Sequence, residues 1–302
     1  MVMKQVKKVA KQRLQGVGAR LLGPELLSEI DRASSLNKAS QIMLAMRYKE
    51  MVRRGEPLPS FEEVEFRTFS QNGEDGILLF IFSVIGTTNR TLLDLGSGNG
   101  LIANSTNLLV YHGWNGLLVD GSEDNANMAR EFFTRCKDTA SWPPKVVAAW
   151  LDVESINRLV AENGLAGSID LLSIDIDGCD YWIWEALEQV QPRVVVLEYL
   201  DILGPSRAWS IPYRPDFVGE NDELGLCYGG ASLPAFVKLG RRKGYRLVGC
   251  QQYGYNAFFV RNDIAPALLP EVPVESCFSH PKVKYGIETR LGRVIHKPWV
   301  EV

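Results

Sequence analysis

The stretch Thr91-Leu-Leu-Asp-Leu-Gly-Ser-Gly-Asn-Gly100 decides the fold of this chain. Its first five residues are an apolar run interrupted by one carboxylate, which predicts a buried strand. The three glycines that follow permit a tight turn and a close approach of the backbone to a ligand. From about Asn104 to His112 the pattern predicts a helix, whose N-terminus offers unpaired N–H groups to a polar ligand. A strand, a glycine-rich turn and a helix in this order indicate a nucleoside-binding α/β sheet.

Short apolar runs continue to alternate with longer amphipathic stretches along the chain. Because strands that alternate with helices form parallel sheets, we expect a Rossmann-like, doubly wound sheet of seven strands. The last two runs are separated only by Gln252-Tyr-Gly-Tyr-Asn256, which predicts a terminal hairpin with one antiparallel strand. The fold class is therefore α/β, mostly parallel, with a helical N-terminal appendage. The expected strands are 90–95, 116–120, 145–149, 169–174, 194–199, 245–251 and 257–261.

Residues 1–60 are expected to form the helical N-terminal appendage. Residues 1–20 hold six basic residues and no acidic one, interleaved with apolar residues. A basic amphipathic helix of this kind can contact an anionic membrane surface or an acidic partner, or it can pack its apolar stripe on the domain. We expect a break at Pro24 and at residues 34–35, ahead of a second helix at 38–54.

The main domain is expected at residues 61–262, followed by a C-terminal tail at 263–302. Within the domain, residues 201–230 lack clear periodicity and are rich in proline, glycine and aromatic residues. A long irregular stretch in a compact domain is more often a functional lid than a passive loop. Its aromatic side chains suit a carbohydrate or a planar acceptor, and they can equally pack the insertion onto the domain.

The composition limits the class of protein. A formal net charge of -3 gives no general attraction to nucleic acid, so no nucleic-acid partner is expected. The five cysteines are scattered without a metal-binding spacing, which indicates a reducing compartment. No apolar run approaches the roughly 20 residues that span a bilayer, and the N-terminus lacks the apolar core of a signal peptide. We expect a cytoplasmic protein that is at most peripheral at the inner membrane surface.

Acidic residues at three strand ends indicate the kind of ligand. Asp94 precedes the glycines, where its carboxylate would attract an ammonium group and repel a pyrophosphate. The glycine spacing G-x-G-x-G also differs from the G-x-G-x-x-G of dinucleotide-binding turns. Asp120 closes the second strand, where it can bind both ribose hydroxyls, and Asp152 follows the third, where it can bind an adenine amino group. The alternative is a turn whose glycines serve only the packing of strand against helix.

These features resemble a class I S-adenosylmethionine (SAM)-dependent methyltransferase. A set of shorter motifs between about residues 66 and 262 resembles, more narrowly, the FkbM-type methyltransferases. The motifs are Ser70-Gln-Asn-Gly-Glu-Asp-Gly76, Asn104-Ser-Thr-Asn107, Gly113-Trp-Asn-Gly-Leu-Leu-Val-Asp120, Ile174-Asp-Ile-Asp-Gly178, Gly230-Ala-Ser-Leu233, Lys243-Gly-Tyr-Arg-Leu-Val248 and Asn256-Ala-Phe-Phe-Val260. The resemblance implies methyl transfer from SAM to a hydroxyl of a sugar, a glycan or a small natural product. The expected cofactor-binding residues are Gln71, Asp94, Gly96, Gly98, Asn104, Asp120, Gly121, Asp152 and Asp175.

The fourth and fifth predicted strands end in carboxylates. Because the carboxyl ends of parallel strands meet at one edge of a sheet, Asp175, Asp177 and Glu198 are the expected catalytic residues. A carboxylate can take the acceptor's proton directly, or a divalent cation can bind the acceptor oxygens and lower their pKa. Asp175 and Glu198 are similar in placement to the residues that related sugar O-methyltransferases use for Mg²⁺, which makes them the expected metal ligands. Asp177 or Asp180 can instead cap the helix that follows.

Two other functions are compatible with the sequence. An NAD-linked oxidoreductase would use the same glycine turn, although Asp94 and the glycine spacing oppose it. A non-catalytic SAM-fold module, recruited through residues 1–20, would not need the acidic cluster.

Overall fold

The computed structural model describes residues 24–223 and 225–302. The chain divides into two compact units, Met1–Arg47 and Tyr48–Val302. This boundary lies before the expected one at residue 60. The Tyr48 ring is buried and packs edge to face on Phe80 of the second unit, with 5.0 Å between the ring centroids. Within the described ranges, every helix is too short or too polar to cross a bilayer.

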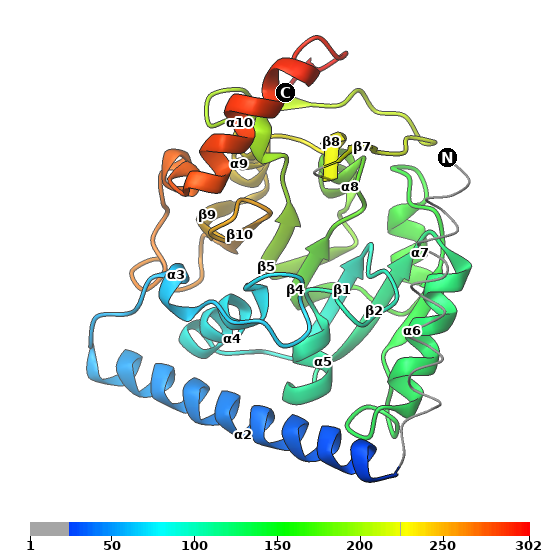
Figure 1. Ribbon diagram of the computed structural model, residues 1–302, viewed down its shortest axis with the longest axis vertical. Coiled ribbons are helices and arrows are strands. Elements are labelled where there is room, and N and C mark those ends of the chain that lie inside the picture. The colour runs from blue at the N-terminus through cyan, green and yellow to red at the C-terminus, as the bar shows by residue number, and fades with distance from the viewer. Residues whose placement is uncertain (1–23, 224) are drawn as a thin grey trace. The chain divides into compact units, whose positions relative to one another are not determined.

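Helix α2 (Pro24–Arg54), blue in Figure 1, is continuous. The expected break at residues 34–35 is therefore wrong. Serine costs a helix only about 0.5 kcal/mol relative to alanine, so two serines do not interrupt thirty helical residues. The basic helix expected at residues 1–20 lies outside the described residues.

The second unit is built on a seven-stranded sheet in the order β3-β2-β1-β4-β5-β10-β9 (Figure 1). Neighbouring strands are parallel except at β10, which runs antiparallel to both β5 and β9. The strand order reverses between β1 and β4, which is the topological switch point of a doubly wound sheet. The predicted fold class is confirmed, and each predicted strand overlaps an observed one. The strands are β1 (Thr91–Leu95), β2 (Asn115–Asp120), β3 (Lys145–Ala148), β4 (Gly167–Ile174), β5 (Val190–Glu198), β9 (Tyr245–Cys250) and β10 (Asn256–Arg261).

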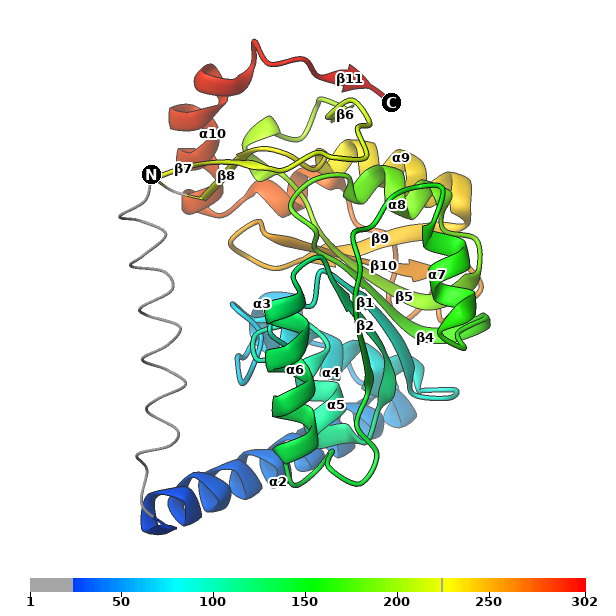
Figure 2. The ribbon, with the colours of Figure 1, turned by 90° about the vertical axis from the view of Figure 1, so that its right-hand side faces the viewer.

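Helices cover both faces of this sheet (Figure 2). One face carries α4 (Glu74–Ile85), α5 (Thr106–His112) and α6 (Glu123–Arg135), and the other carries α7 (Ile156–Glu162), α8 (Asp180–Ala186) and α9 (Leu233–Lys243). Buried aromatic rings pack the helices of the second face against the sheet. The ring centroids of Trp184 in α8 and Phe259 in β10 lie 5.3 Å apart. The short α3 (Phe61–Val64) precedes α4.

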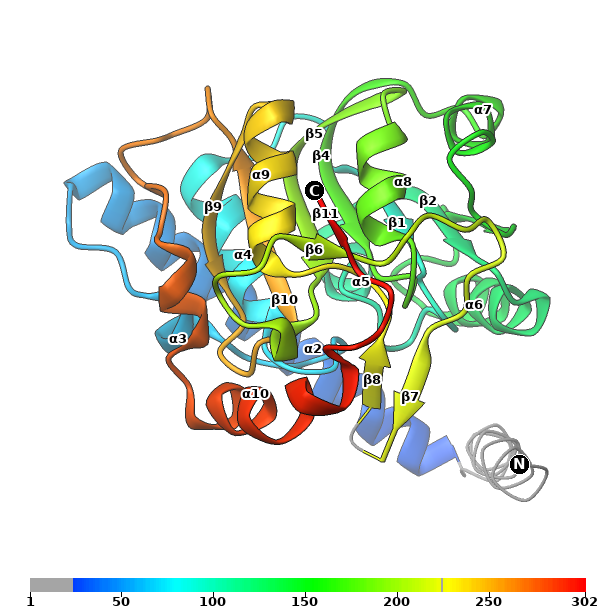
Figure 3. The same ribbon diagram turned by 90° about the horizontal axis from the view of Figure 1, so that it is seen from above.

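The residues expected as a lid and as a tail are joined to each other (Figure 3). The insertion contains η1 (Asp201–Leu203), β6 (Trp209–Ser210) and a hairpin of β7 (Glu220–Asp222) and β8 (Gly225–Tyr228). The C-terminal residues form η2 (Val274–Phe278), α10 (Pro281–Val294) and β11 (Val300–Glu301), within the same compact unit. β11 pairs antiparallel with β6, and Arg290 of α10 forms an ion pair of 3.2 Å with Asp222 of β7.

A buried ion pair fixes the entry to β1. Asp170 of β4 accepts hydrogen bonds from the backbone N–H groups of Thr88, Asn89 and Arg90 and lies 2.8 Å from the Arg193 guanidinium. Burial alone would raise the pKa of Asp170, but Arg193 and the backbone donors hold it below its ordinary value. This one carboxylate therefore organises the loop that leads into the first strand.

We expect Asp170→Asn to lower the free energy of unfolding by about 3–5 kcal/mol, because the variant leaves the buried Arg193 without its counter-charge. Asp263→Asn, which breaks the more exposed pair with Arg261, is the matched control and should cost less than about 1 kcal/mol. Urea unfolding followed by circular dichroism measures both. Similar losses for the two variants would contradict the special role of Asp170.

Candidate active site

Two glycines of the turn after β1 are constrained by sterics: Gly96, and Gly100, where φ is +72° and a Cβ atom would lie 2.9 Å from the buried Phe133 ring. Gly96 has φ +89°, and a Cβ atom there would lie 1.8 Å from the carbonyl oxygen of Asp175. Gly98 has φ +55°, but a Cβ atom there would point into open space. The packing explanation therefore accounts for Gly96 and Gly100, whereas Gly98 borders a space that a ligand can enter.

Asp94 is a buried carboxylate whose Oδ2 atom has no hydrogen-bond partner among the described residues. Burial raises the pKa of Asp94 to about 6, although the nearby hydroxyls of Ser105 and Ser173 offset part of that effect. Neither hydroxyl forms a well-aligned hydrogen bond to Oδ2, and both hydroxyl oxygens are themselves unpartnered and buried. Unpaired buried polar atoms are costly, so their grouping at the carboxyl ends of β1 and β4 indicates a place for a ligand with hydrogen-bond donors.

Asp120 and Asp152 are engaged by their own loops. The Asp120 carboxylate accepts hydrogen bonds from Gly98 N at 2.8 Å, Ser122 N at 2.8 Å and Asn125 Nδ2 at 3.0 Å. Asp152 accepts from the backbone N–H groups that follow it, at 2.8 and 2.9 Å, and its hydrogen bonding to Ser155 lowers its pKa. A carboxylate has about four acceptor positions, so both side chains keep some capacity for a ligand. Their expected contacts with ribose and adenine stay predictions.

Gly121 and Trp150 lie side by side next to Asp120. A Cβ atom on Gly121 would come within 3.0 Å of the Trp150 ring, and the indole N–H donates to the carbonyl of Pro215 at 2.6 Å. Trp150 nevertheless remains 54% exposed. Nothing in the sequence marks Trp150 as a site residue, because an aromatic residue after a strand is more often part of the core.

Asn104 is linked by hydrogen bonds through Asn256 to Glu74, the first residue of α4. Its Nδ2 atom donates to Asn256 Oδ1 at 3.4 Å, and Asn256 Nδ2 donates to the fully buried Glu74 at 3.0 Å. Asn256 also faces Glu198 across the β5–β10 ladder. Asn256 begins the motif Asn256-Ala-Phe-Phe-Val260, but its link to Asn104 and Glu74 joins residues more than 150 positions apart and has no local signal in the sequence. Gln71, by contrast, is exposed, and its carbonyl accepts from Arg67.

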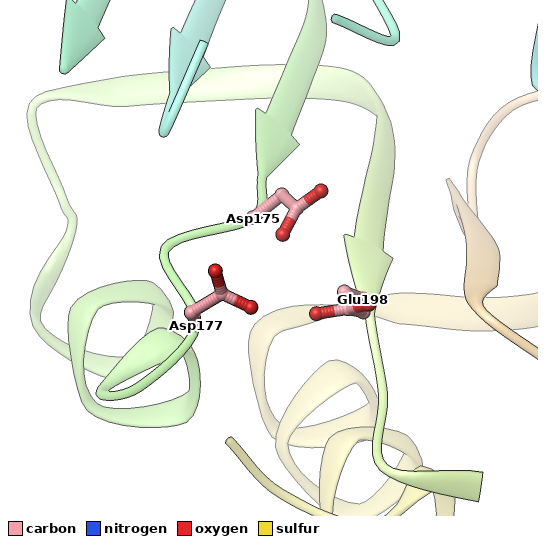
Figure 4. Close-up of side chains that lie close together, drawn as sticks. All are labelled: Asp175, Asp177 and Glu198. Atoms are coloured by element: carbon pink, nitrogen blue, oxygen red, sulfur yellow. The ribbon is translucent and has the colours of Figure 1, made fainter. Parts of the chain in front are cut away.

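Asp175, Asp177 and Glu198 form the acidic cluster. Each offers one carboxylate oxygen within 4.8 Å of the others, and Figure 4 shows the three side chains turned toward one another. Asp175 follows the last residue of β4, Asp177 lies in the next loop, and Glu198 ends β5. The structure therefore brings all three expected catalytic residues together.

Like charges and burial perturb this cluster. Burial, and then repulsion from Asp177, raises the pKa of Asp175 well above its ordinary value. Burial, and then the neighbouring Asp175, does the same to the pKa of Glu198. Two interacting carboxyl groups of this kind titrate as a pair, and the pair holds a proton more strongly than either group does in water.

Neither candidate aspartate caps helix α8, so that expectation is wrong. The N-cap is Cys179, and Asp180 is the first helical residue. The Asp180 carboxylate instead accepts from the N–H groups of Ile176 and Gly178, each at 2.9 Å, because the tight loop presents two donors to it. Burial raises the pKa of Asp180 to about 6. Asp177 adopts φ +56°, an uncommon backbone conformation for a residue with a side chain.

The insertion lies over the loops that follow β3 and β4. Tyr213 accepts a hydrogen bond from Val153 N at 3.2 Å, and Cys179 donates to the carbonyl of Arg214 at 3.3 Å. The Phe217 ring would lie 3.1 Å from a Cβ atom on Gly178. Tyr213 and Phe217 therefore pack onto the domain, and Phe217 lies beside the loop that carries Asp177.

No family model and no curated protein matches this sequence. Among solved structures, the O-methyltransferase from Bacillus cereus in complex with SAH is 15% identical with a TM-score of 0.39, covering 73% of this chain and 89% of that one. The CcbJ methyltransferase from Streptomyces caelestis is 16% identical with a TM-score of 0.39, covering 62% and 88%. Magnesium protoporphyrin IX methyltransferase from Synechocystis PCC 6803 with bound SAM is 13% identical with a TM-score of 0.38, covering 62% and 77%. The likeness at these values is distant, so the function is inferred below from the site itself.

The raised pKa of Glu198 predicts a pH dependence of stability. The native state binds a proton here more strongly than the unfolded state, so this contribution is fully present below the unfolded pKa of about 4.3 and is lost as the pH rises through the higher native value. We therefore expect the melting temperature of Glu198→Gln to fall less between pH 5 and 9 than that of the wild type. Glu62→Gln, at an exposed position, serves as the control. Parallel melting curves for the wild type and Glu198→Gln would contradict the raised pKa.

Proposed function

We propose that this protein is a SAM-dependent O-methyltransferase whose acceptor hydroxyl binds beside the acidic cluster of Asp175, Asp177 and Glu198. One observation carries the proposal. The buried Asp94, whose Oδ2 atom has no hydrogen-bond partner among the described residues, and the acidic cluster lie at the carboxyl ends of β1, β4 and β5, on both sides of the topological switch point. In doubly wound sheets this is the place where ligands bind.

The residues of the turn suit a cationic nucleoside such as SAM. An ammonium group would supply the hydrogen-bond donor that Asp94 Oδ2 lacks, and its charge would stabilise the ionised carboxylate. Asp120 would accept from ribose hydroxyls with its remaining capacity, and Gly121, Trp150 and Asp152 would border the base. Gln71, Gly96, Gly98, Asn104 and Asp175 complete the proposed cofactor-binding set. When bound, SAM supplies a methyl carbon activated by a positively charged sulfur.

The acidic cluster would remove the proton from the acceptor. An alcohol is a weak acid, so the protein must provide a base or lower the pKa of the hydroxyl. The Asp175–Glu198 pair binds protons more strongly than ordinary carboxyl groups do, which suits Glu198 or Asp175 as the base. The three carboxylates are also hard oxygen ligands in one place, and they would hold a divalent cation such as Mg²⁺. We propose Asp175 and Glu198 as its ligands, with Asp177 as a third.

The acceptor is proposed to be a hydroxyl of a sugar, a glycan or a small natural product. The aromatic ring of Phe217 beside Gly178, in the loop that carries Asp177, supports this choice, because aromatic surfaces with a few polar groups suit such molecules. The motifs between residues 66 and 262 favour an FkbM-type enzyme, and the scattered cysteines favour one that acts in the cytoplasm.

Ligand binding tests the cofactor. We expect SAM and S-adenosylhomocysteine to raise the melting temperature, with Kd values in the micromolar range, and NAD to leave it unchanged. A ligand at 100 times its Kd adds about 2.7 kcal/mol to the stability of the folded state. Asp94→Asn should weaken SAM binding by about tenfold, because it removes one charge-assisted hydrogen bond. Stabilisation by NAD alone would favour the oxidoreductase instead.

Turnover tests the acidic cluster. With a panel of sugar and phenolic acceptors, Glu198→Gln should lose at least about a hundredfold in S-adenosylhomocysteine formation, because loss of a general base costs 10²–10⁴-fold. Its Kd for SAM should stay within about threefold of the wild type. The exposed Glu62→Gln variant is again the control. Full turnover in Glu198→Gln and also in Asp175→Asn would show that the cluster is not the catalytic site.

A further inference from the structure

Helix α2 exposes a stripe of apolar side chains along one side. Leu36 is 67% exposed, Met43 is 72% exposed and Met46 is 64% exposed, and Ile42 lies beside them at 45%. The spacings of seven, four and three residues between these positions place them on one side of an α-helix. Large apolar residues that gather on one exposed face mark an interaction surface more often than residues exposed singly do.

Basic residues border this apolar stripe. Arg47 and Lys49 are exposed, and the side chains of Arg53 and Arg54 are 76% and 57% exposed. The one acidic residue of the stretch from residue 36 to residue 54 is Glu50, which is half-buried and forms ion pairs with Arg53 and Arg54. The outer face of α2 is defined here as Leu36, Ile42, Met43 and Met46 with Arg47, Lys49, Arg53 and Arg54. Glu50, which lies on the same side, is neutralised by its ion pairs with Arg53 and Arg54, so the face is apolar along its length with a net positive charge toward residue 54.

The charge of the chain is strongly asymmetric around this helix. Residues 1–54 contain twelve basic and four acidic residues, a net charge of +8. Because the whole chain carries -3, the remaining 248 residues carry -11. An anionic surface would therefore attract the first 54 residues and repel the rest of the chain.

We propose that the outer face of α2 docks this protein on an anionic lipid surface. Methionine, leucine and isoleucine would enter the boundary between head groups and acyl chains, while the arginine and lysine side chains would contact the lipid phosphates. The phosphates of a nucleic acid would also pair with these basic side chains, but a nucleic acid has no apolar region in which the exposed methionines could be buried. A second copy of α2 would satisfy the apolar side chains but would bring like charges together. An anionic bilayer would both bury the apolar side chains of this face and pair with its basic side chains.

Vesicle flotation of the full chain tests this inference. We expect binding to vesicles of phosphatidylcholine and phosphatidylglycerol, little binding to phosphatidylcholine alone, and release at high salt. The double variant Met43→Ser/Met46→Ser should lose about tenfold or more in partitioning, because it removes most of the apolar area that would insert. The matched control is Val218→Ser/Tyr285→Ser, which changes two residues that are 70% and 62% exposed outside α2 and should bind vesicles like the wild type. Circular dichroism and the SAM-induced thermal shift verify folding, and neither readout depends on catalysis.

Four results would overturn the inference. The first is unchanged vesicle binding by the Met43/Met46 double variant. The second is binding that disappears when residues 1–23 are removed but survives both methionine substitutions. The third is a wild-type dimer that becomes monomeric in the double variant by light scattering. The fourth is tight binding to duplex DNA or RNA that Arg47→Gln/Arg53→Gln weakens while the methionine substitutions leave it intact.

Discussion

The contact between Gly96 and the carbonyl oxygen of Asp175 is the constraint on which the site depends. The two backbones pass so closely that no side chain fits between them. Hydrogen bonds from Asp175 N to Leu95 O at 2.9 Å and from Gly96 N to Val119 O at 2.8 Å hold the ends of β1, β2 and β4 together. The carboxylates that follow these strands are therefore positioned by the sheet itself, which is more rigid than any loop.

This rigid edge allows the protein to keep acidic groups close together in a partly buried place. Burial first, and then repulsion within the cluster, disfavours the ionised forms of Asp175 and Glu198 and raises the pKa of both carboxyl groups. Asp180 shows the contrasting case, because two loop N–H groups bind its carboxylate and shape the loop that carries Asp177. Proteins accept such local destabilisation mainly where a ligand or a reaction uses it.

The C-terminal residues determine the position of the insertion. Arg290 and Arg293 of α10 form ion pairs with Asp222, and β11 pairs with β6. The Arg290–Asp222 pair is nearly buried, so water and salt screen it less than they screen an exposed pair. Segments that lie far apart in the sequence thus cooperate in covering one edge of the sheet, a relation that neither segment reveals alone.

The sequence by itself determined where the strands lie along the chain, that the sheet is mostly parallel, and which chemical types stand at the strand ends. Apolar periodicity, glycine turns and strand-end carboxylates are local signals. It also indicated that Asp175, Asp177 and Glu198 would meet, since strand ends converge in a parallel sheet. Only the tertiary structure decided that Cys179 rather than an aspartate occupies the N-cap position of α8, and that Asn256 connects Asn104 to Glu74. The physical reason is that these outcomes depend on competition among hydrogen-bond partners and packing contacts, many of them far apart along the chain.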